Sequence, residues 1–362
     1  MKRTCNSHAF QSLHLCSILM ADDVIHPNFQ RDILEACIPG DVLDILLLDR
    51  TTGKNIMWMT DGYVKYESVF DVKMGVQDEI SADVISRPGN KIIRPRVDKG
   101  KAEQKERIQK KAEVFTPSWI CNNMINEFDA AWFDRKPAPF TTEGSRDGGW
   151  KRLPGKVEFP DTPEHTWLDY VKYRCLEMCC GEGPFLVSRY DTTTGEVIPV
   201  PDRIGILDRK LRIVTENVGT KPDEWLKYAI LALQATLGFE WQGDNLLIAR
   251  ENILYTMLEY YKFYCTDEPV DHATLLELAE IISWNIWQMD GIKYVVPMSC
   301  KPKVTKETLL DGTVETHVEE CPGCSKKGNR RHFGTYCKVM DWNTGKPVEF
   351  RAIAENGGGH GK

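Results

Sequence analysis

The sequence predicts an α/β domain, and three observations support that prediction. The stretch CLEMCCGEGPF, residues 175–185, has the pattern of a strand that ends in a tight turn and a helix start. A second unit of the same kind follows, with a strand that ends near Glu240 and an amphipathic helix after it. The chain of 362 residues, 42% hydrophobic and 27% charged, has the length and composition of a globular protein with a sizeable core. Repeated strand, turn and helix units are typical of α/β domains.

Residues 1–98 precede this core and are predicted to form a small α+β domain. The apolar run from Asp41 to Asp49 is closed by the turn-like TTGKN, so we expect two adjacent strands joined by Thr-Gly-Lys. The first 23 residues begin with basic side chains but lack the continuous apolar segment and cleavage site of a signal peptide, which predicts a cytoplasmic start. No apolar run approaches the ~18 residues that a membrane span requires. The 12 cysteines show no even spacing and fit a reducing compartment.

Residues 99–298 form the predicted core domain, which opens with helices and contains one long loop. The charged segment from Lys99 to Lys111 has acids and bases four positions apart, as in a solvated helix. With a net charge of −7 for the whole chain, the basic stretch 91–115 is either such a linking helix or a local DNA-binding stripe. Residues 135–163 are rich in proline, glycine and charge and are predicted to be a surface loop insertion.

A further helix is predicted directly after the charged segment. Thr116 is placed to cap it and Pro117 to open it. Its apolar face is predicted to include Ile120, Met124 and Phe128.

A glycine-bracketed turn closes the first core strand. Glu177 ends the strand, Gly181 and Gly183 flank Glu182, and Pro184 opens the next helix. A Gly-x-Gly turn after a strand lets a cofactor approach the backbone and directs it towards helix N–H groups. Taken alone, the pattern is equally compatible with an ordinary strand-to-helix turn.

Four segments place this turn in a wider pattern. FTPSWI (115–120), GEGPF (181–185), GFEWQGDNLLIAREN (238–252) and NIWQMDG (285–291) occur in the order found in gamma-class adenine-N6 DNA methyltransferases. From about residue 41 to residue 342, the chain resembles the proteins described as subunit M of restriction-modification systems. The resemblance implies a Rossmann-like, S-adenosylmethionine-dependent methyltransferase fold, with DNA as a partner.

The resemblance also implies a cofactor site. The residues that match the segment packing on the methionine end of S-adenosylmethionine are Phe115, Thr116 and Pro117. Those that match the loop beneath its amino-acid and ribose portions are Glu177, Cys180, Gly181 and Gly183. Glu240 matches the acid that accepts both ribose hydroxyls, and Asp290 the acid that binds the adenine amino group, roles that suit carboxylates. The alternatives are a strand-end cap at Glu240 and a turn residue at Asp290.

The catalytic loop of this family does not occur in the sequence. The family holds a flipped adenine with an Asn/Asp-Pro-Pro-Tyr/Phe loop, and these 362 residues contain no Pro-Pro dipeptide. We therefore expect an incomplete sheet whose first strand has an unpaired, apolar edge. We also expect a second polypeptide that carries the catalytic loop and the remaining strands, so that the chain is inactive alone.

Two other functions stay open at this point. The missing loop also fits a non-catalytic scaffold or recognition subunit that retains the methyltransferase fold. In the N-terminal domain, Asp49, Asp71 and Lys73 loosely resemble the carboxylate and lysine metal site of a nuclease, a pattern that strands often produce by chance.

Residues 299–342 are predicted to form a zinc-knuckle-like, or zinc-ribbon-like, segment. The predicted zinc ligands are Cys300, Cys321, Cys324 and Cys337, with His332 lying between the last two. A turn of reduced thiols and a redox pair are the alternatives.

Basic residues flank the predicted knuckle, and they either contact DNA phosphates or form a solvated turn. They are Lys326, Lys327, Arg330 and Arg331. Residues 343–362 are predicted to be a flexible tail.

Overall fold

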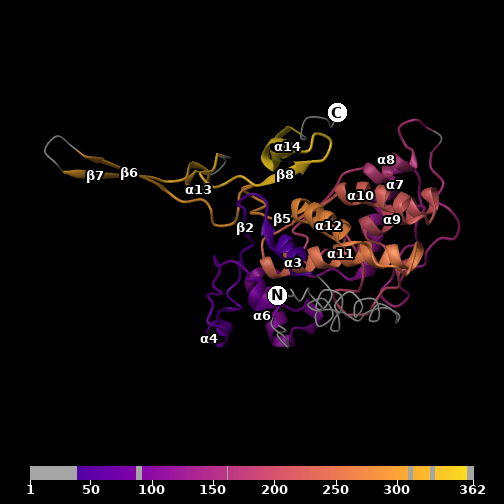
Figure 1. The fold of residues 1–362 in the computed structure, drawn as a ribbon, viewed down its shortest axis with the longest axis horizontal. Coiled ribbons are helices and arrows are strands. Elements are labelled where there is room, and N and C mark those ends of the chain that lie inside the picture. The colour runs from indigo at the N-terminus through magenta and orange to yellow at the C-terminus, as the bar shows by residue number, and fades with distance from the viewer. Residues whose placement is uncertain (1–38, 87–91, 161, 309–312, 327–330, 357–362) are drawn as a thin grey trace, which may run out of the picture.

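A three-stranded parallel sheet lies at the centre of the protein, for which a computed structural model describes residues 39–86, 92–160, 162–308, 313–326 and 331–356 (Figure 1). The strand order is β3-β4-β5, and both neighbouring pairs are parallel. These strands are β3 (Cys175–Met178), β4 (Thr236–Glu240) and β5 (Ile286–Gln288). The prediction of a mixed α/β fold is confirmed, and β4 leads through a short turn into a helix that begins at Gly243, as expected. The helix predicted to begin at Pro184 is absent: residues 181–199 contain no helix, because the chain after β3 forms a loop whose Asp191 binds the start of another helix at Ser118, and the next α-helix begins only at Ile206.

Helices connect the parallel strands and cover the sheet. α11 and α12 contact both β4 and β5, and α10 contacts α9, α11 and α12. The helices are α8 (Trp167–Lys172), α9 (Ile206–Val218), α10 (Pro222–Gln234), α11 (Gly243–Tyr264) and α12 (His272–Asn285). Local sequence explains their starts: Thr166 forms a capping box with Asp169 before α8, and the Asp271 side chain accepts a hydrogen bond from Thr274 N–H at 2.7 Å before α12.

The N-terminal region begins with a helix rather than the predicted strand. The apolar run after Asp41 forms α3 (Gly40–Leu47), which packs against α12 and buries Val42, Leu46 and Leu47. The strands that follow are only two residues each, β1 (Leu48–Asp49) and β2 (Lys54–Asn55), and they pair antiparallel around the Thr-Gly-Lys turn. The strand prediction was wrong because a short apolar run has no periodicity that separates a buried helix from a buried strand. Residues 1–38, including the predicted cytoplasmic start, lie outside the described residues.

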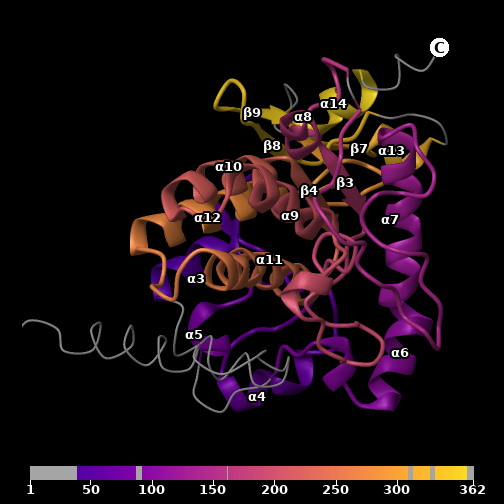
Figure 2. The ribbon, with the colours of Figure 1, turned by 90° about the vertical axis from the view of Figure 1, so that its right-hand side faces the viewer.

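Short elements complete the N-terminal region before the two helices that follow it. They are η1 (Val64–Tyr66), α4 (Glu67–Phe70), α5 (Ala82–Ile85) and η2 (Arg96–Asp98). The charged segment then forms α6 (Lys101–Lys111), which confirms the predicted helix. Figure 2 shows α6 and the following helix, α7 (Ser118–Trp132), along one side of the molecule.

The buried face of α7 (Ser118–Trp132) is largely polar, which differs from the sequence prediction: Ser118, Asn122, Asn126 and Asp129 are buried beside Cys121, Ile125 and Ala130. Met124 and Phe128, on the predicted apolar face, are 57% and 36% exposed. The opposite face buries Asp129, whose carboxylate is paired with the buried guanidinium of Arg209 and accepts a hydrogen bond from Tyr170 at 2.7 Å. This ion pair bridges α7 and α9, and it decides which face of α7 points inward.

The predicted surface loop and tail have different outcomes. Residues 135–160 contain no helix or strand, as expected for the insertion, but Phe140 and Val157 are buried in the main hydrophobic core, so the segment is not confined to the surface as predicted. The predicted flexible tail contains β9 (Lys346–Glu349), paired with β8 (Lys338–Asp341), and then α14 (Phe350–Asn356). Phe350 is buried against Phe239 and Trp287, so an apolar contact with the sheet orders this segment. Residues 357–362 lie outside the described residues.

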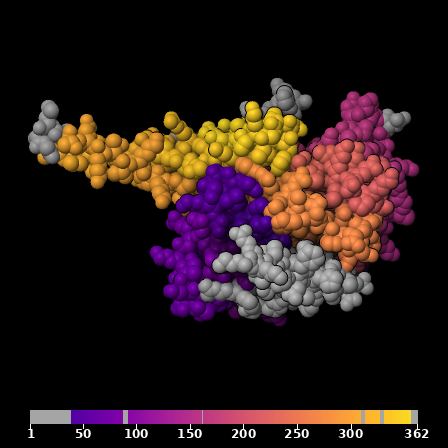
Figure 3. Space-filling view, viewed as in Figure 1, coloured from indigo at the N-terminus to yellow at the C-terminus, as the bar shows by residue number. Residues whose placement is uncertain are grey.

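A long hairpin projects from the body of the molecule. Its strands are β6 (Lys303–Thr308) and β7 (Val314–Glu319), followed by the short helix α13 (Pro322–Ser325). Figures 1 and 3 show this hairpin extending away from the other elements, and every residue of both strands is exposed. In the part of the chain that the structure describes, no helix is long and apolar enough to cross a membrane.

Candidate cofactor site and metal cluster

A cavity of about 880 Å³ lies at the carboxyl ends of β3 and β4. It brings together the segment before α7, the turn after β3 and the start of α11. Among the predicted cofactor residues, those that line it are Phe115, Thr116, Glu177, Cys180, Gly181 and Glu240. Small-molecule sites in proteins commonly occupy about 300–1,000 Å³, and in open α/β sheets they lie at this edge.

The turn after β3 requires glycine at two positions. Gly181 and Gly183 have φ of 56° and 80°, in the left-handed region that glycine adopts without steric cost. Cys180 N–H donates to the Phe239 carbonyl at 2.9 Å and Gly183 N–H to the Cys180 carbonyl at 2.8 Å, which folds the turn back against β4. Cys179, between strand and turn, also has a positive φ of 57°, although it is not glycine.

Glu240, at the end of β4, is held by three backbone N–H groups. Its Oε2 accepts from Gly181 at 2.9 Å, and its Oε1 accepts from Trp241 at 2.9 Å and Gln242 at 3.1 Å. Burial raises the pKa of Glu240, and these donors oppose that shift. The carboxylate therefore has a fixed position between the glycine turn and the cavity.

Two other side chains of the cavity carry buried oxygens without a hydrogen-bond partner among the described residues. These are Oε2 of Glu177 and Oδ1 of Asn245. Burial, followed by the charge of Glu240, raises the pKa of Glu177 well above its usual range. Buried polar atoms in proteins are nearly always hydrogen-bonded, so these two oxygens are exceptions among the side chains that line the cavity.

The segment before α7 is fixed in the cavity wall by a loop from further along the chain. The Asp191 carboxylate accepts from Ser118 N–H at 2.7 Å, and the Thr192 hydroxyl donates to the Thr116 carbonyl at 3.4 Å. This contact takes the place of the cap predicted for Thr116, because Pro117 occupies the N-cap position and no side chain of its own caps the helix.

Three predicted cofactor residues do not line the cavity. Pro117 is the N-cap residue of α7 and Gly183 belongs to the turn after β3, and neither of them lines the cavity. The Asp290 carboxylate accepts from the N–H groups of Ile292 at 3.1 Å and Lys293 at 3.2 Å, which is the turn geometry that the sequence left as an alternative. The adenine-binding role of Asp290 stays a prediction.

The cavity also includes residues that sequence reasoning missed. Trp241, Gln242 and Asn245 directly follow Glu240 and line the same wall. The available signal was their position at a strand-to-helix junction, because side chains at that junction face the carboxyl edge of the sheet.

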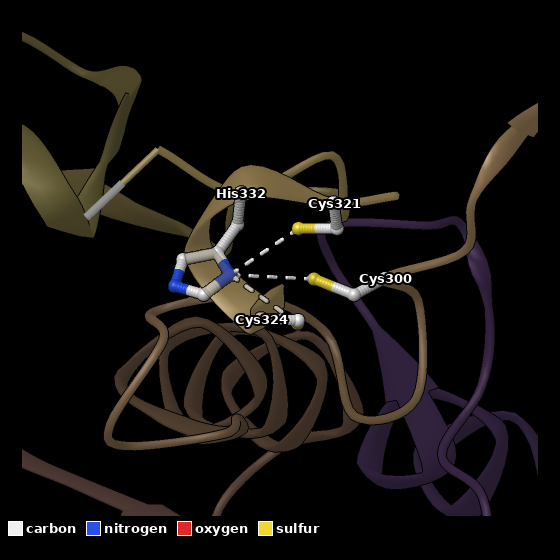
Figure 4. Close-up of side chains that lie close together, drawn as sticks. All are labelled: Cys300, Cys321, Cys324 and His332. Atoms are coloured by element: carbon white, nitrogen blue, oxygen red, sulfur yellow. Dashed lines mark hydrogen bonds between the residues drawn. The ribbon is translucent and has the colours of Figure 1, made fainter. Parts of the chain in front are cut away.

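A cluster of three cysteines and one histidine lies at the base of the projecting hairpin. It comprises Cys300, Cys321, Cys324 and His332, and their ligand atoms all lie within 4.8 Å of one another. The His332 Nδ1 lies 3.7 Å from each of the three Sγ atoms (Figure 4). A tetrahedral zinc ion with Zn–S of about 2.3 Å and Zn–N of about 2.0 Å places these atoms about 3.6 Å apart. The cluster could therefore hold a structural zinc ion.

The structure corrects the fourth predicted ligand, because His332 joins the three cysteines and Cys337 does not. Cys337 is fully buried in the apolar cluster with Phe239 and Trp287, and its thiol donates to the Gln288 carbonyl at 3.4 Å. Burial raises the pKa of this thiol. After His332 the chain turns into the core, which carries Cys337 away from the other thiols.

The surroundings of the cluster favour ionisation of the Cys321 thiol. Partial burial opposes ionisation of Cys321, but the N–H groups of Phe333 and Cys324 outweigh it and lower the pKa of Cys321 to about 6. Desolvation raises the pKa of Cys300 to about 11. Of the predicted basic neighbours, Lys326 and Arg331 fall within the described residues, whereas Lys327 and Arg330 lie outside them.

Comparison with known proteins gives no match, since no protein-family model, curated protein or solved structure is similar to this chain. The function must therefore be inferred from the cavity, the metal cluster and the four ordered sequence segments.

Proposed function

We propose that this chain is the S-adenosylmethionine-binding part of an adenine-N6 DNA methyltransferase of a restriction-modification system. The observation that carries the proposal is the convergence of three separate sequence segments on one cavity. The segments containing Phe115, Glu177 and Glu240 are those that resemble the family's cofactor-binding motifs. They meet at the carboxyl edge of a parallel sheet, where α/β proteins bind nucleotide-like ligands.

The hydrogen-bond acceptors of the cavity suit this ligand. S-adenosylmethionine presents an ammonium group, two ribose hydroxyls and an exocyclic amine, all of which donate hydrogen bonds, and its sulfonium is a cation. The cavity offers the carboxylates of Glu177 and Glu240 and the amide oxygen of Asn245 as acceptors.

The methyl-accepting half of the site is proposed to come from outside residues 1–362. Among the described residues β3 pairs only with β4, so its other edge has no strand neighbour. Leu176 and Met178 on this strand are 40% and 71% exposed, and they line the cofactor cavity together with Met124 of α7. An apolar, unpaired edge suits a further strand from a second polypeptide that also carries the Pro-Pro-containing loop. DNA as the methyl acceptor, and a cytoplasmic location, rest on the sequence alone.

Calorimetric titration of the purified chain with S-adenosylmethionine tests the proposal. We expect micromolar binding, about 8 kcal/mol, by the wild-type chain. Glu240→Ala is expected to weaken binding by about 10- to 100-fold, because it removes charged hydrogen bonds to the ribose. Glu277→Ala, an exposed residue of α12 far from the cavity lining, is the matched control and should bind like the wild type. A folded wild-type chain that binds a dinucleotide or binds nothing would refute the proposal.

A non-catalytic scaffold subunit is the second candidate, and the absence of a Pro-Pro dipeptide favours it. Methyl transfer to plasmid DNA separates the two functions. Transfer that requires both this chain and the product of a neighbouring gene would identify a split enzyme. Cofactor binding with no transfer under any such combination would identify a scaffold.

A further inference from the structure

We propose that Cys300, Cys321, Cys324 and His332 bind one structural zinc ion, and that this ion fixes the base of the β6–β7 hairpin to the body of the protein. The equal distances of 3.7 Å from the His332 Nδ1 to the three Sγ atoms place the nitrogen at one corner of a tetrahedron. Four protein ligands fill the coordination sphere of zinc, so the site is closed to water and structural rather than catalytic.

Two glycines make the close approach of these ligands sterically feasible. A Cβ built on Gly323 would lie 2.4 Å from Cε1 of the His332 ring. A Cβ built on Gly334 would lie 2.8 Å from Sγ of Cys300 and 2.6 Å from Oγ of Ser299. Any larger residue at either position would push a ligand out of the cluster. The backbone is therefore shaped around the four ligand side chains.

The composition of the cluster favours a metal over a redox pair of cysteines. A disulfide needs only two sulfurs, whereas here a third thiol and an imidazole nitrogen converge on the same point. The Sγ of Cys321 accepts a hydrogen bond from Phe333 N–H at 3.3 Å, a contact that stabilises a thiolate. Thiolates and imidazole select zinc over magnesium or calcium, which prefer oxygen ligands.

The hairpin needs a support of this kind because it has no core of its own. All residues of β6 and β7 are exposed, and an isolated two-stranded hairpin is marginally stable in water. Cys300 lies just before β6 and Cys321 just after β7, so a shared ion joins the two ends of the hairpin. The Lys303 ammonium, at the start of β6, also lies 4.2 Å from the centre of the Phe333 ring.

The same cluster is linked to the sheet through the segment that follows His332. Val296 N–H donates to the Thr335 carbonyl at 2.8 Å, and Cys337 N–H donates to the Tyr294 carbonyl at 3.0 Å. These bonds pair the cluster with the turn that follows β5. Zinc bound at the cluster therefore sets the direction in which the hairpin leaves the body, independently of whether the cofactor cavity is filled.

Metal analysis of the full-length chain tests the ligand set. We expect one zinc per chain by mass spectrometry of the purified protein, and tetrahedral thiolate bands in the visible spectrum when Co²⁺ replaces it. Cys324→Ser and His332→Ala should lose the metal, and Cys337→Ser should retain it. Cys179→Ser, an exposed cysteine outside the cluster, is the matched control and should also retain it. A wild-type chain that takes up neither ion, or a His332→Ala chain that keeps its zinc, would overturn the proposed site.

Limited proteolysis tests the structural role and does not depend on a folded variant. Removing zinc from the wild-type chain with a chelator should increase cleavage within residues 303–319 by about tenfold, and adding zinc back should reverse the increase. Cleavage elsewhere in the body should change little. Unchanged cleavage of the hairpin after complete zinc removal would refute the proposed role of the ion, while the calorimetric test of the cofactor cavity would be unaffected.

Discussion

Replacing Glu259 by glutamine is expected to destabilise the protein by about 3 kcal/mol at neutral pH. Glu259 lies on α11, and its carboxylate pairs with two guanidiniums, those of Arg189 and Arg203. Both arginine side chains are only 2% exposed, and that of Glu259 is 16% exposed. Arg189 also donates to Asn252 at 3.3 Å, which in turn donates to the Glu182 carbonyl at 3.1 Å, so this group of residues supports the turn beneath the cofactor cavity.

The magnitude follows from the ionisation of Glu259. Burial by itself would raise its pKa, but the charges of Arg189 and Arg203 outweigh burial and lower the pKa from 4.5 to about 2. That difference corresponds to about 3 kcal/mol in favour of the ionised form in the folded state. Because the folded-state pKa lies below the unfolded one, this contribution is complete above about pH 4.5 and is lost as the pH falls towards 2.

Urea unfolding of the wild type and Glu259→Gln, compared at about pH 7 and about pH 3.5, measures this effect. The difference in unfolding free energy should be about 3 kcal/mol at the higher pH and clearly smaller at the lower one. Glu106→Gln is the matched control, because Glu106 and Lys110 form a solvent-exposed pair on α6 whose loss is expected to change stability little. A loss at Glu259 no larger than that of the control, or one independent of pH, would refute the reasoning.

Two further predictions concern the cofactor cavity. Glu177→Gln is expected to stabilise the free chain in thermal unfolding, increasingly as the pH rises, because it removes a carboxylate with a raised pKa whose ionisation costs stability. The same change is expected to weaken S-adenosylmethionine binding about tenfold. For the same reason, wild-type affinity should strengthen as the pH rises and Glu177 ionises, and a flat pH profile would contradict the role of Glu177. Cys179→Gly is expected to raise the unfolding free energy by about 0.5–1 kcal/mol, since glycine accepts the positive φ of 57°; a loss of stability would contradict this.

Local sequence patterns predicted the elements whose features are local. The strand that ends in Glu240, the glycine turn at Gly181 and the charged helix α6 each follow from neighbouring residues. The Cys-x-x-Cys turn at Cys321 likewise brings two thiols together through a short connection. In each case the residues that define the feature lie close together in the sequence.

The features that the sequence did not predict depend on partners far along the chain. Asp129 of α7 forms an ion pair with Arg209 of α9, and this pair sets the inward face of α7. The face that carries Asp129 is therefore buried, whereas the apolar side chains of Met124 and Phe128 are exposed. The fourth residue of the cluster is His332, whereas the sequence predicted Cys337. The path of the chain into β8, rather than residue type, decides which side chain reaches the cluster.

The two unpartnered oxygens of the cavity bear on whether this fold binds a cofactor or only serves as a scaffold. Glu177 Oε2 and Asn245 Oδ1 are buried without a hydrogen-bond partner among the described residues, and the charge of Glu240 adds to the cost of ionising Glu177. A scaffold that never binds a ligand gains nothing from this arrangement, and a glutamine at position 177 would avoid the charge. Other buried side-chain atoms without a partner among the described residues, such as Nε1 of Trp58 and Oδ1 of Asp208, lie away from the cavity. The two oxygens therefore favour a cofactor-binding chain only in combination with the three sequence segments that converge on the same cavity.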